Sequence, residues 1–232
     1  MNSPPSDLAE RSPAGFLFSR RTVENNAKIL YAMAFFDAQN LFQHAKDAFG
    51  HFHPNFDPQK LHNAVCAQNG WTPNLVRFYT GIPDSNRSAM WAGYWNSRVL
   101  ALKRSGVSVT TRKLRYRDTQ ITMPDGTVET STIAQEKGVD VRLALDVVKF
   151  ARKRNFDVAV IYSQDQDLCE VVEEIKEIAQ EQNRFIQICC PFPVGPNATS
   201  RRGIDGTEWF RMDRDFYDAC LDHHDYRPKQ RQ

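Results

Sequence analysis

The chain has 232 residues, 41% of them hydrophobic and 11% aromatic, and its 30 basic and 28 acidic side chains leave a formal net charge of +2. These totals predict a soluble protein with one large domain, or one domain with extensions, and they exclude a disordered chain or a small disulfide-stapled scaffold. No apolar run approaches a bilayer span and the five cysteines form no C-x-x-C pair, so we expect no membrane partner, reduced thiols and a cytoplasmic location.

The ends of the chain differ from its middle. Residues 1–27 lack the apolar segment of a secretion signal and are expected to form a partly disordered tail. Residues 28–190 are taken as the domain. Residues 191–232 begin in a stretch rich in Pro, Gly, Ser and Asn, and we expect a loop and an extension that packs on the domain and ends in a frayed basic tail.

Strand and helix signals alternate along the domain. Strands are predicted at 29–36, 74–81, 107–117, 157–163 and 184–190, and helices at 41–50, 57–70, 85–106, 138–154 and 167–182. An Asp-Gly turn predicts a hairpin around 115–132, and an edge strand at 207–212 precedes a short helix or turn at 213–224. This order predicts a three-layer α/β fold with a mainly parallel central sheet flanked by helices.

Carboxylates follow two of the predicted strands. Asp37 comes directly after the apolar run 29–36, and Asp165 and Asp167 follow the strand 157–163. Ligands of open α/β sheets bind beyond the carboxyl ends of the strands, so the three side chains are expected at one edge. In the helix 138–154, an advance of about 100° per residue turns Asp140 toward the apolar face and Asp146 toward solvent.

A cluster made only of carboxylates suits a hard divalent cation, Mg²⁺ or Mn²⁺, rather than zinc. Such an ion would offset the cost of a buried Asp140 and is suited to phosphate chemistry. The alternative reading is structural: Asp165 and Asp167 can cap the helix that follows them, and Asp37 can start the helix after it. Asp140 fits the structural reading least well, because it lies amid the predicted apolar face.

Three stretches in this order, "AFFDAQNLF", "KGVDVRLALDVV" and "FDVAVIYSQDQDLCEVV", resemble the NYN domain family, the PIN-like group that includes the LabA-like proteins. The resemblance runs from about residue 32 to residue 190. It departs from the family's usual Ser-Gly-Asp-Ser-Asp-Phe at Gln164, Gln166 and Leu168, which leaves the carboxylates in place.

The resemblance implies a PIN-like fold, an aspartate site for Mg²⁺ or Mn²⁺, and the ribonuclease activity that some members have. By position it implies Asp37, Asp140, Asp165 and Asp167 as catalytic residues, the first three as metal ligands, and Asn40 as a support for Asp37 at the substrate side. Asp146 also matches a family acid, although the helix geometry turns it outward. The reaction implied is hydrolysis of RNA by a metal-activated water, which leaves a 5′-phosphate and a 3′-hydroxyl.

The stretch from Ser85 to Arg117 contains eight basic residues and no acidic one, which suits a single-stranded RNA. We expect Arg87, Arg98, Arg112 and Arg115 to bind its phosphates. Trp91 and Trp95 recur at helical spacing and are expected to face the core. An ordinary solvated basic face is the alternative interpretation of these charges.

Other functions remain open at this stage. A nucleic-acid or protein binding module of the same fold, with little activity, is the main alternative, whereas a receiver-like regulator would need a lysine that "QICCPF" does not supply. His51, His53, His223 and His224 lack partners at zinc-ligand spacing. The sequence leaves a homo-oligomer as an open alternative to a monomer.

Overall fold

The computed structural model describes residues 28–53, 55–123 and 126–228, so the predicted tail over 1–27 lies outside the described residues. A six-stranded sheet forms the centre, with the strand order β3-β2-β1-β6-β7-β8 and parallel pairing throughout. Its strands are β1 (Tyr31–Asp37), β2 (Thr72–Ile82), β3 (Ser108–Lys113), β6 (Val158–Tyr162), β7 (Gln187–Pro193) and β8 (Glu208–Met212).

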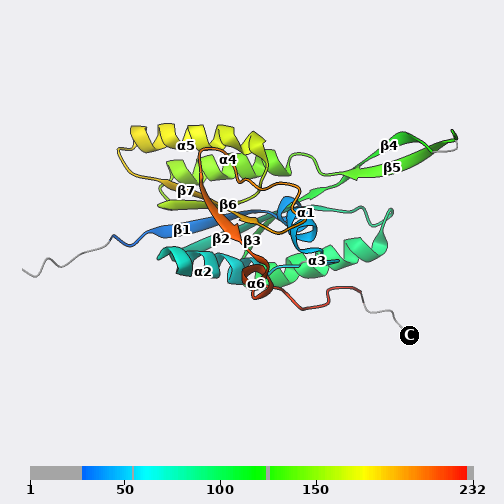
Figure 1. The fold of residues 1–232 in the computed structure, drawn as a ribbon, viewed down its shortest axis with the longest axis horizontal. Helices are drawn as coiled ribbons and strands as arrows, with labels where there is room; N and C mark the ends of the chain where they lie inside the picture. Colours follow the sequence, from blue (N-terminus) through cyan, green and yellow to red (C-terminus); the bar gives the residue numbers. More distant parts are fainter. Residues whose placement is uncertain (1–27, 54, 124–125, 229–232) are drawn as a thin grey trace, which may run out of the picture.

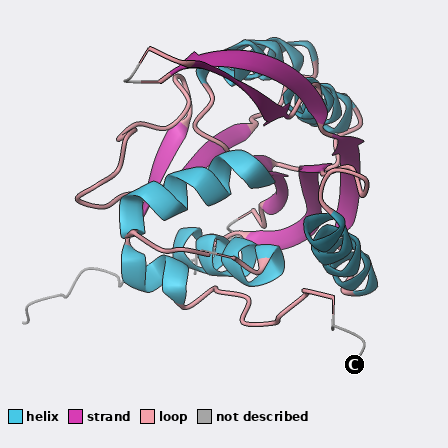
Figure 2. Ribbon diagram, turned by 90° about the vertical axis from the view of Figure 1, so that its right-hand side faces the viewer, coloured by secondary structure: helices cyan, strands magenta, loops and turns pink. Residues whose placement is uncertain are grey.

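Helices cover both faces of this sheet (Figures 1 and 2). One face carries α1 (Ala38–Phe49), α2 (Pro58–Asn69), α3 (Ala89–Arg104) and the short α6 (Arg214–Asp218), and the other carries α4 (Val139–Arg152) and α5 (Cys169–Glu181). The predicted three-layer α/β architecture with a mainly parallel sheet is therefore confirmed. None of the described helices is long and apolar enough to cross a membrane.

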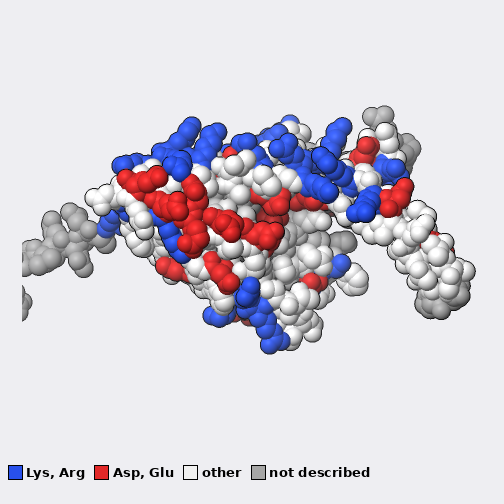
Figure 3. All heavy atoms as spheres, turned by 90° about the horizontal axis from the view of Figure 1, so that it is seen from above, with Lys and Arg blue, Asp and Glu red and all other residues white. Residues whose placement is uncertain are grey.

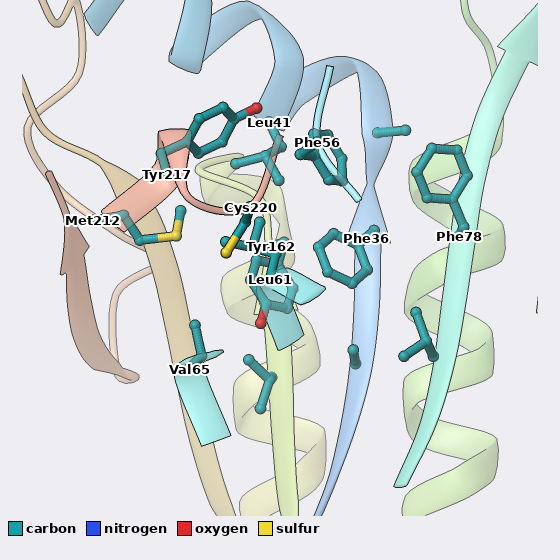
Figure 4. Close-up of a cluster of buried hydrophobic side chains, with 14 of the residues drawn as sticks. Phe36, Leu41, Phe56, Leu61, Val65, Phe78, Tyr162, Met212, Tyr217 and Cys220 are labelled. Carbon is teal, nitrogen blue, oxygen red and sulfur yellow. The ribbon is translucent and has the colours of Figure 1, made fainter. Parts of the chain in front are cut away.

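Alternation along the buried strands divides the core into two clusters. In β1, Phe36 points to the face of α1 and α2, and Phe35 to the face of α4 and α5. Figure 4 shows the first cluster, where Phe36 stacks on Tyr162 of β6 with 3.9 Å between ring centroids. Tyr217 of α6 is completely buried in the same cluster, so the segment after residue 190 adds both a strand and core side chains.

The predicted strand at 107–117 is wrong in its length. β3 ends at Lys113, and Arg115 already belongs to a separate antiparallel hairpin of β4 (Arg115–Thr122) and β5 (Val128–Gln135). This hairpin extends away from the three layers (Figure 1). Its base stays attached to the sheet because the backbone N–H of Leu114 bonds to the carbonyl of Ile82, and the Tyr116 hydroxyl accepts from the backbone N–H of Asp84.

Candidate active site

The strand order reverses direction at β1. From β1 the chain proceeds outward to β2 and β3, and it later returns to β6 on the opposite side of β1. A crevice beyond the carboxyl ends of two strands at such a switch point is the usual ligand site of an open α/β sheet. Asp37 ends β1 and Ser163 follows β6, so both lie at the switch point.

Asp37 is held in place by two hydrogen bonds. Its Oδ1 accepts from the backbone N–H of Asn40 at 3.2 Å, which caps α1, and its Oδ2 accepts from the Ser163 hydroxyl at 3.2 Å. Only 7% of the residue is exposed. Burial raises the pKa of Asp37 to about 6, the two hydrogen bonds oppose this rise, and the charges of Asp165 and Asp140 add to it.

The loop after β6 is tied to α1 and β1. The Asn40 side-chain oxygen accepts from the backbone N–H of Gln164 at 2.9 Å, and the Ser163 Oγ accepts from the backbone N–H of Asp165 at 3.2 Å. Asp165 in turn caps the short 3-10 helix Gln166–Leu168 by accepting from the backbone N–H of Asp167 at 3.1 Å. Asp165 therefore has the capping role of the structural reading and also adds negative charge near Asp37.

Glu136 is a site residue that the sequence reasoning missed. It lies between β5 and α4, and its Oε2 accepts a hydrogen bond from the backbone N–H of Gly81 at the end of β2. Burial raises the pKa of Glu136 to about 7, and the charges of Asp37 and Asp140 add to this rise. A Cβ at position 81 would overlap the Glu136 and Leu114 side chains, so the glycine permits the contact. The signal in the sequence that could have identified Glu136 was its position four residues before Asp140.

The orientation predicted for the two α4 aspartates is wrong. Asp140 is exposed, whereas Asp146 is only 1% exposed and bonds to Arg77 at 2.8 Å, Arg142 at 2.5 Å and the Tyr79 hydroxyl at 2.9 Å. The angle around the helix predicted that Asp140 is buried, but the position of each aspartate along the helix determines its burial. Asp140 is in the first turn, at the rim of the sheet, and Asp146 packs over β2.

The structure thus gathers four carboxylates at one edge: Asp37, Glu136, Asp140 and Asp165 share one electrostatic field. Asp167 is exposed and is not among the charges that raise the pKa of either buried carboxyl. Within the described residues, no three His, Cys, Asp or Glu side chains are placed to hold a metal ion as they stand. The four carboxylates are therefore neighbours that do not converge on one point.

Of the four arginines expected to bind phosphate, Arg98 is the exception. It is 2% exposed, it donates to the Asn55 side chain, the Tyr94 hydroxyl and the Phe56 carbonyl, and its guanidinium lies over the rings of α3 and the core. The prediction for Arg98 is therefore wrong, because its side chain is not available to a substrate. Arg87, Arg112 and Arg115 are exposed, and Arg112 is paired with Gly81 in the β2–β3 register.

A cavity of about 690 Å³ opens beside the carboxylates, and we call it the aromatic cavity. It is lined by Ala38 and Gly81 at the carboxylate end, by the rings of Phe42, Phe52, Trp91 and Trp95, and by residues of the C-terminal segment 222–227. Trp91 is 39% exposed, so its predicted place in the core is wrong. The cavity also brings together His53, His223 and His224, which are distant in the sequence.

Charge is unevenly distributed over the α4 and α5 side of the molecule. Basic side chains gather along one edge of this side, and acidic side chains form a band beside them (Figure 3). Several of these charges pair with each other, as Arg152 does with Glu174 and Glu181. Such exposed ion pairs contribute little to stability. Several charges on this face are thus paired with opposite charges, whereas the carboxylates at the edge of the sheet have no cation beside them among the described residues.

A parallel sheet flanked by helices, with carboxylates at its switch point, is the arrangement of a PIN-like domain. The chain belongs to the NYN domain family, whose model matches residues 31–182. This family is PIN-like and nuclease-type. The predicted family is thus confirmed.

Other comparisons add a structural relative. A Vibrio parahaemolyticus protein of unknown function has a crystal structure similar to this chain, with a TM-score of 0.49 and 20% sequence identity. The similarity covers 81% of this chain and 96% of that one. No curated protein matches the sequence.

Proposed function

We propose that this NYN-domain protein is a metal-dependent ribonuclease that hydrolyses phosphodiester bonds of single-stranded RNA. The observation that carries the proposal is the group of uncompensated carboxylates at the switch point of the sheet. Burial raises the pKa of Asp37 and Glu136, neighbouring acids add to the rise, and no basic side chain of the described residues offsets it, which is unfavourable for folding and favourable for binding a cation.

The donor atoms of this edge fit Mg²⁺ or Mn²⁺. All are carboxylate oxygens, which hard cations prefer, and Mg²⁺ usually takes one or two protein carboxylates together with waters and substrate phosphate. We assign Asp37, Asp140 and Asp165 as the residues that hold the ion, with Glu136 as a fourth acid that the resemblance did not imply. NYN nucleases generally depend on a divalent metal, and such an ion activates water and neutralises charge on a phosphodiester.

The protein's own groups would prepare the site for this chemistry. Ser163 and the Asn40 backbone N–H fix the Asp37 carboxylate, and the Gly81 N–H fixes that of Glu136. Asp167, exposed at the rim, would complete the site or orient the attacking water. Arg87, Arg112 and Arg115 would hold the phosphates of the strand, because they are exposed on the loop and strands around this edge.

One observation favours the alternative, a binding module of the same fold. The absence of three convergent ligands among the described residues is what a chain that binds nucleic acid without cutting it would also show. The cytoplasmic location, the homo-oligomer and the domain boundaries at residues 28 and 190 stay predictions.

Cleavage of end-labelled single-stranded RNA in Mn²⁺, Mg²⁺ or EDTA tests the proposal. We expect cuts that need the metal and that fall at least about a hundredfold in Asp37→Asn, because removal of one preorganised electrostatic group typically costs this much. The matched control is Asp215→Asn, an exposed aspartate in the first turn of α6. Cleavage that persists in EDTA, or survives Asp37→Asn unchanged, would contradict the proposal, and binding without cleavage would favour the binding module.

A further inference from the structure

We infer that the aromatic cavity is a binding site for the unpaired bases of single-stranded RNA, with Trp91 as its main stacking surface. The inference rests on the proposed function, because it places the nucleotides next to the cleaved bond in this cavity. It also replaces the sequence expectation that Trp91 faces the core, whereas Trp95 does pack against the core.

The cavity begins beside the carboxylates. Ala38, which follows Asp37, and Gly81, whose backbone N–H holds Glu136, both line it. A strand with one phosphate at the carboxylates would therefore have a neighbouring nucleotide at the mouth of the cavity. Its volume of about 690 Å³ lies in the range of sites that enclose small organic groups.

Rings form much of the cavity wall, and two of them are unusually exposed. Trp91 is 39% exposed and Phe52 is 86% exposed, and both line the cavity. The ring of Tyr94 meets that of Trp91 in a T-shaped arrangement at 5.5 Å, which fixes the indole without covering it. Stacking on such rings is the usual way in which proteins hold the bases of single strands.

The charges of the cavity suit a polyanion with exposed bases. Its two aspartates are already engaged: Asp225 pairs with Arg227 at 2.7 Å, and Asp222 accepts from the Tyr226 hydroxyl at 2.9 Å. Lys46 on α1 is exposed, and no ion pair to it is found among the described residues. Lys46 is therefore placed to meet a phosphate while the rings meet the bases.

The C-terminal segment builds the outer wall of the cavity. Tyr226 packs on Tyr94 of α3 with 5.9 Å between ring centroids, and a Cβ at Gly93 would lie 2.5 Å from the Pro228 side chain. The glycine in α3 therefore lets the segment lie close to the helix. A double helix keeps its bases stacked inside, so only an unpaired strand can place its bases on the rings of the cavity.

Direct binding tests this inference separately from catalysis. The affinity of fluorescently labelled oligouridylate and of an RNA duplex is measured by anisotropy on the Asp37→Asn background, which keeps the RNA intact. We expect Trp91→Ala to weaken single-strand binding about tenfold, Trp91→Phe to retain most of it, and duplex binding to stay unchanged. The matched control is Trp209→Ala on β8, because Trp209 is also 39% exposed but lies on the other face of the sheet.

Unfolding temperatures of the variants verify that each is folded. Equal single-strand binding by Trp91→Ala and Trp209→Ala, or an equal loss for strand and duplex, would overturn the inference. Failure of the cavity and failure of the nuclease give different results. If the protein cleaves RNA but binding does not depend on Trp91, only the proposal for the cavity is rejected. If binding depends on Trp91 but no RNA is cleaved, only the nuclease proposal is rejected.

Discussion

Asp37 and Asp146 are both almost completely buried, but their surroundings are opposite. Asp146 has two arginines and a tyrosine hydroxyl around its carboxylate. Asp37 has a serine hydroxyl and one backbone N–H, and the charges nearest to it are other carboxylates. A buried charge normally needs a partner. Asp146 finds its partner within the fold, whereas Asp37 is left to find one outside it.

The largest expected effect on stability comes from removing the ion pairs of Asp146. Asp146→Ala leaves Arg77 and Arg142 without their shared carboxylate, and removing one partner of a buried ion pair typically costs about 3–5 kcal/mol of stability. Urea unfolding followed by circular dichroism measures the loss. Asp140→Ala is the matched control on the same helix, and its effect should stay within about 0.5 kcal/mol, because Asp140 is exposed. Similar losses for both variants would contradict the comparison.

Removal of the Asp37 carboxylate, which has no cation beside it among the described residues, should increase stability instead. Without metal, Asp37→Asn is expected to stabilise the fold at pH 8 by about 2 kcal/mol, because it removes a carboxylate whose pKa is raised to about 6 and gives up one hydrogen bond. A carboxyl with a raised pKa binds more protons in the folded chain. Its contribution to stability is therefore present below about pH 4 and is lost as the pH rises through about 6.

The measurement is the unfolding temperature of both proteins in EDTA between pH 5 and pH 8. The parent should lose stability relative to Asp37→Asn as the pH rises, because Asp37 ionises while buried and beside the charges of Asp165 and Asp140. At pH 5 the difference should vanish or reverse. A parent that is the more stable protein at pH 8 without metal would contradict the assignment.

The smallest expected effect is on Mn²⁺ affinity, when Glu136 is replaced. If it is a fourth acid of the site, Glu136→Gln should weaken Mn²⁺ binding about tenfold, the lower range for groups that support metal ligands. The shift of the unfolding temperature with Mn²⁺ concentration measures this affinity without an activity assay. Glu129→Gln, on the exposed hairpin strand β5, is the control. Equal Mn²⁺ responses in the parent and Glu136→Gln would remove Glu136 from the site.

Much of the fold was predictable from local patterns. The continuous apolar runs of β1 and β6 marked the central strands, and the glycines at positions 50 and 70 marked the helix ends, where both adopt left-handed backbone angles. The end of β3 was not predictable, because no glycine or proline separates it from the first strand of the hairpin. Only hydrogen bonding to β2 shows that the strand leaves the sheet at Lys113.

The site was predictable in part for the same reason. Strand ends are local features, so Asp37 and Asp165 could be placed at one edge from the sequence. Other features depend on which element packs on each helix: the opposite roles of Asp140 and Asp146, the burial of Arg98 and the exposure of Trp91. Periodicity gives the direction of a side chain around a helix, but it does not show which neighbours the helix has.

The sequence by itself determined the family, the alternation of strands and helices, the carboxylate that ends β1 and the carboxylates that follow β6. These follow from residue order, because burial of a strand requires an apolar run and a charge ends it. The tertiary structure alone decided that Glu136 joins the acidic edge, that Asp146 is compensated, and that the C-terminal segment closes a cavity beside the site. These contacts join residues far apart in the chain, and their energies depend on packing that no local pattern contains.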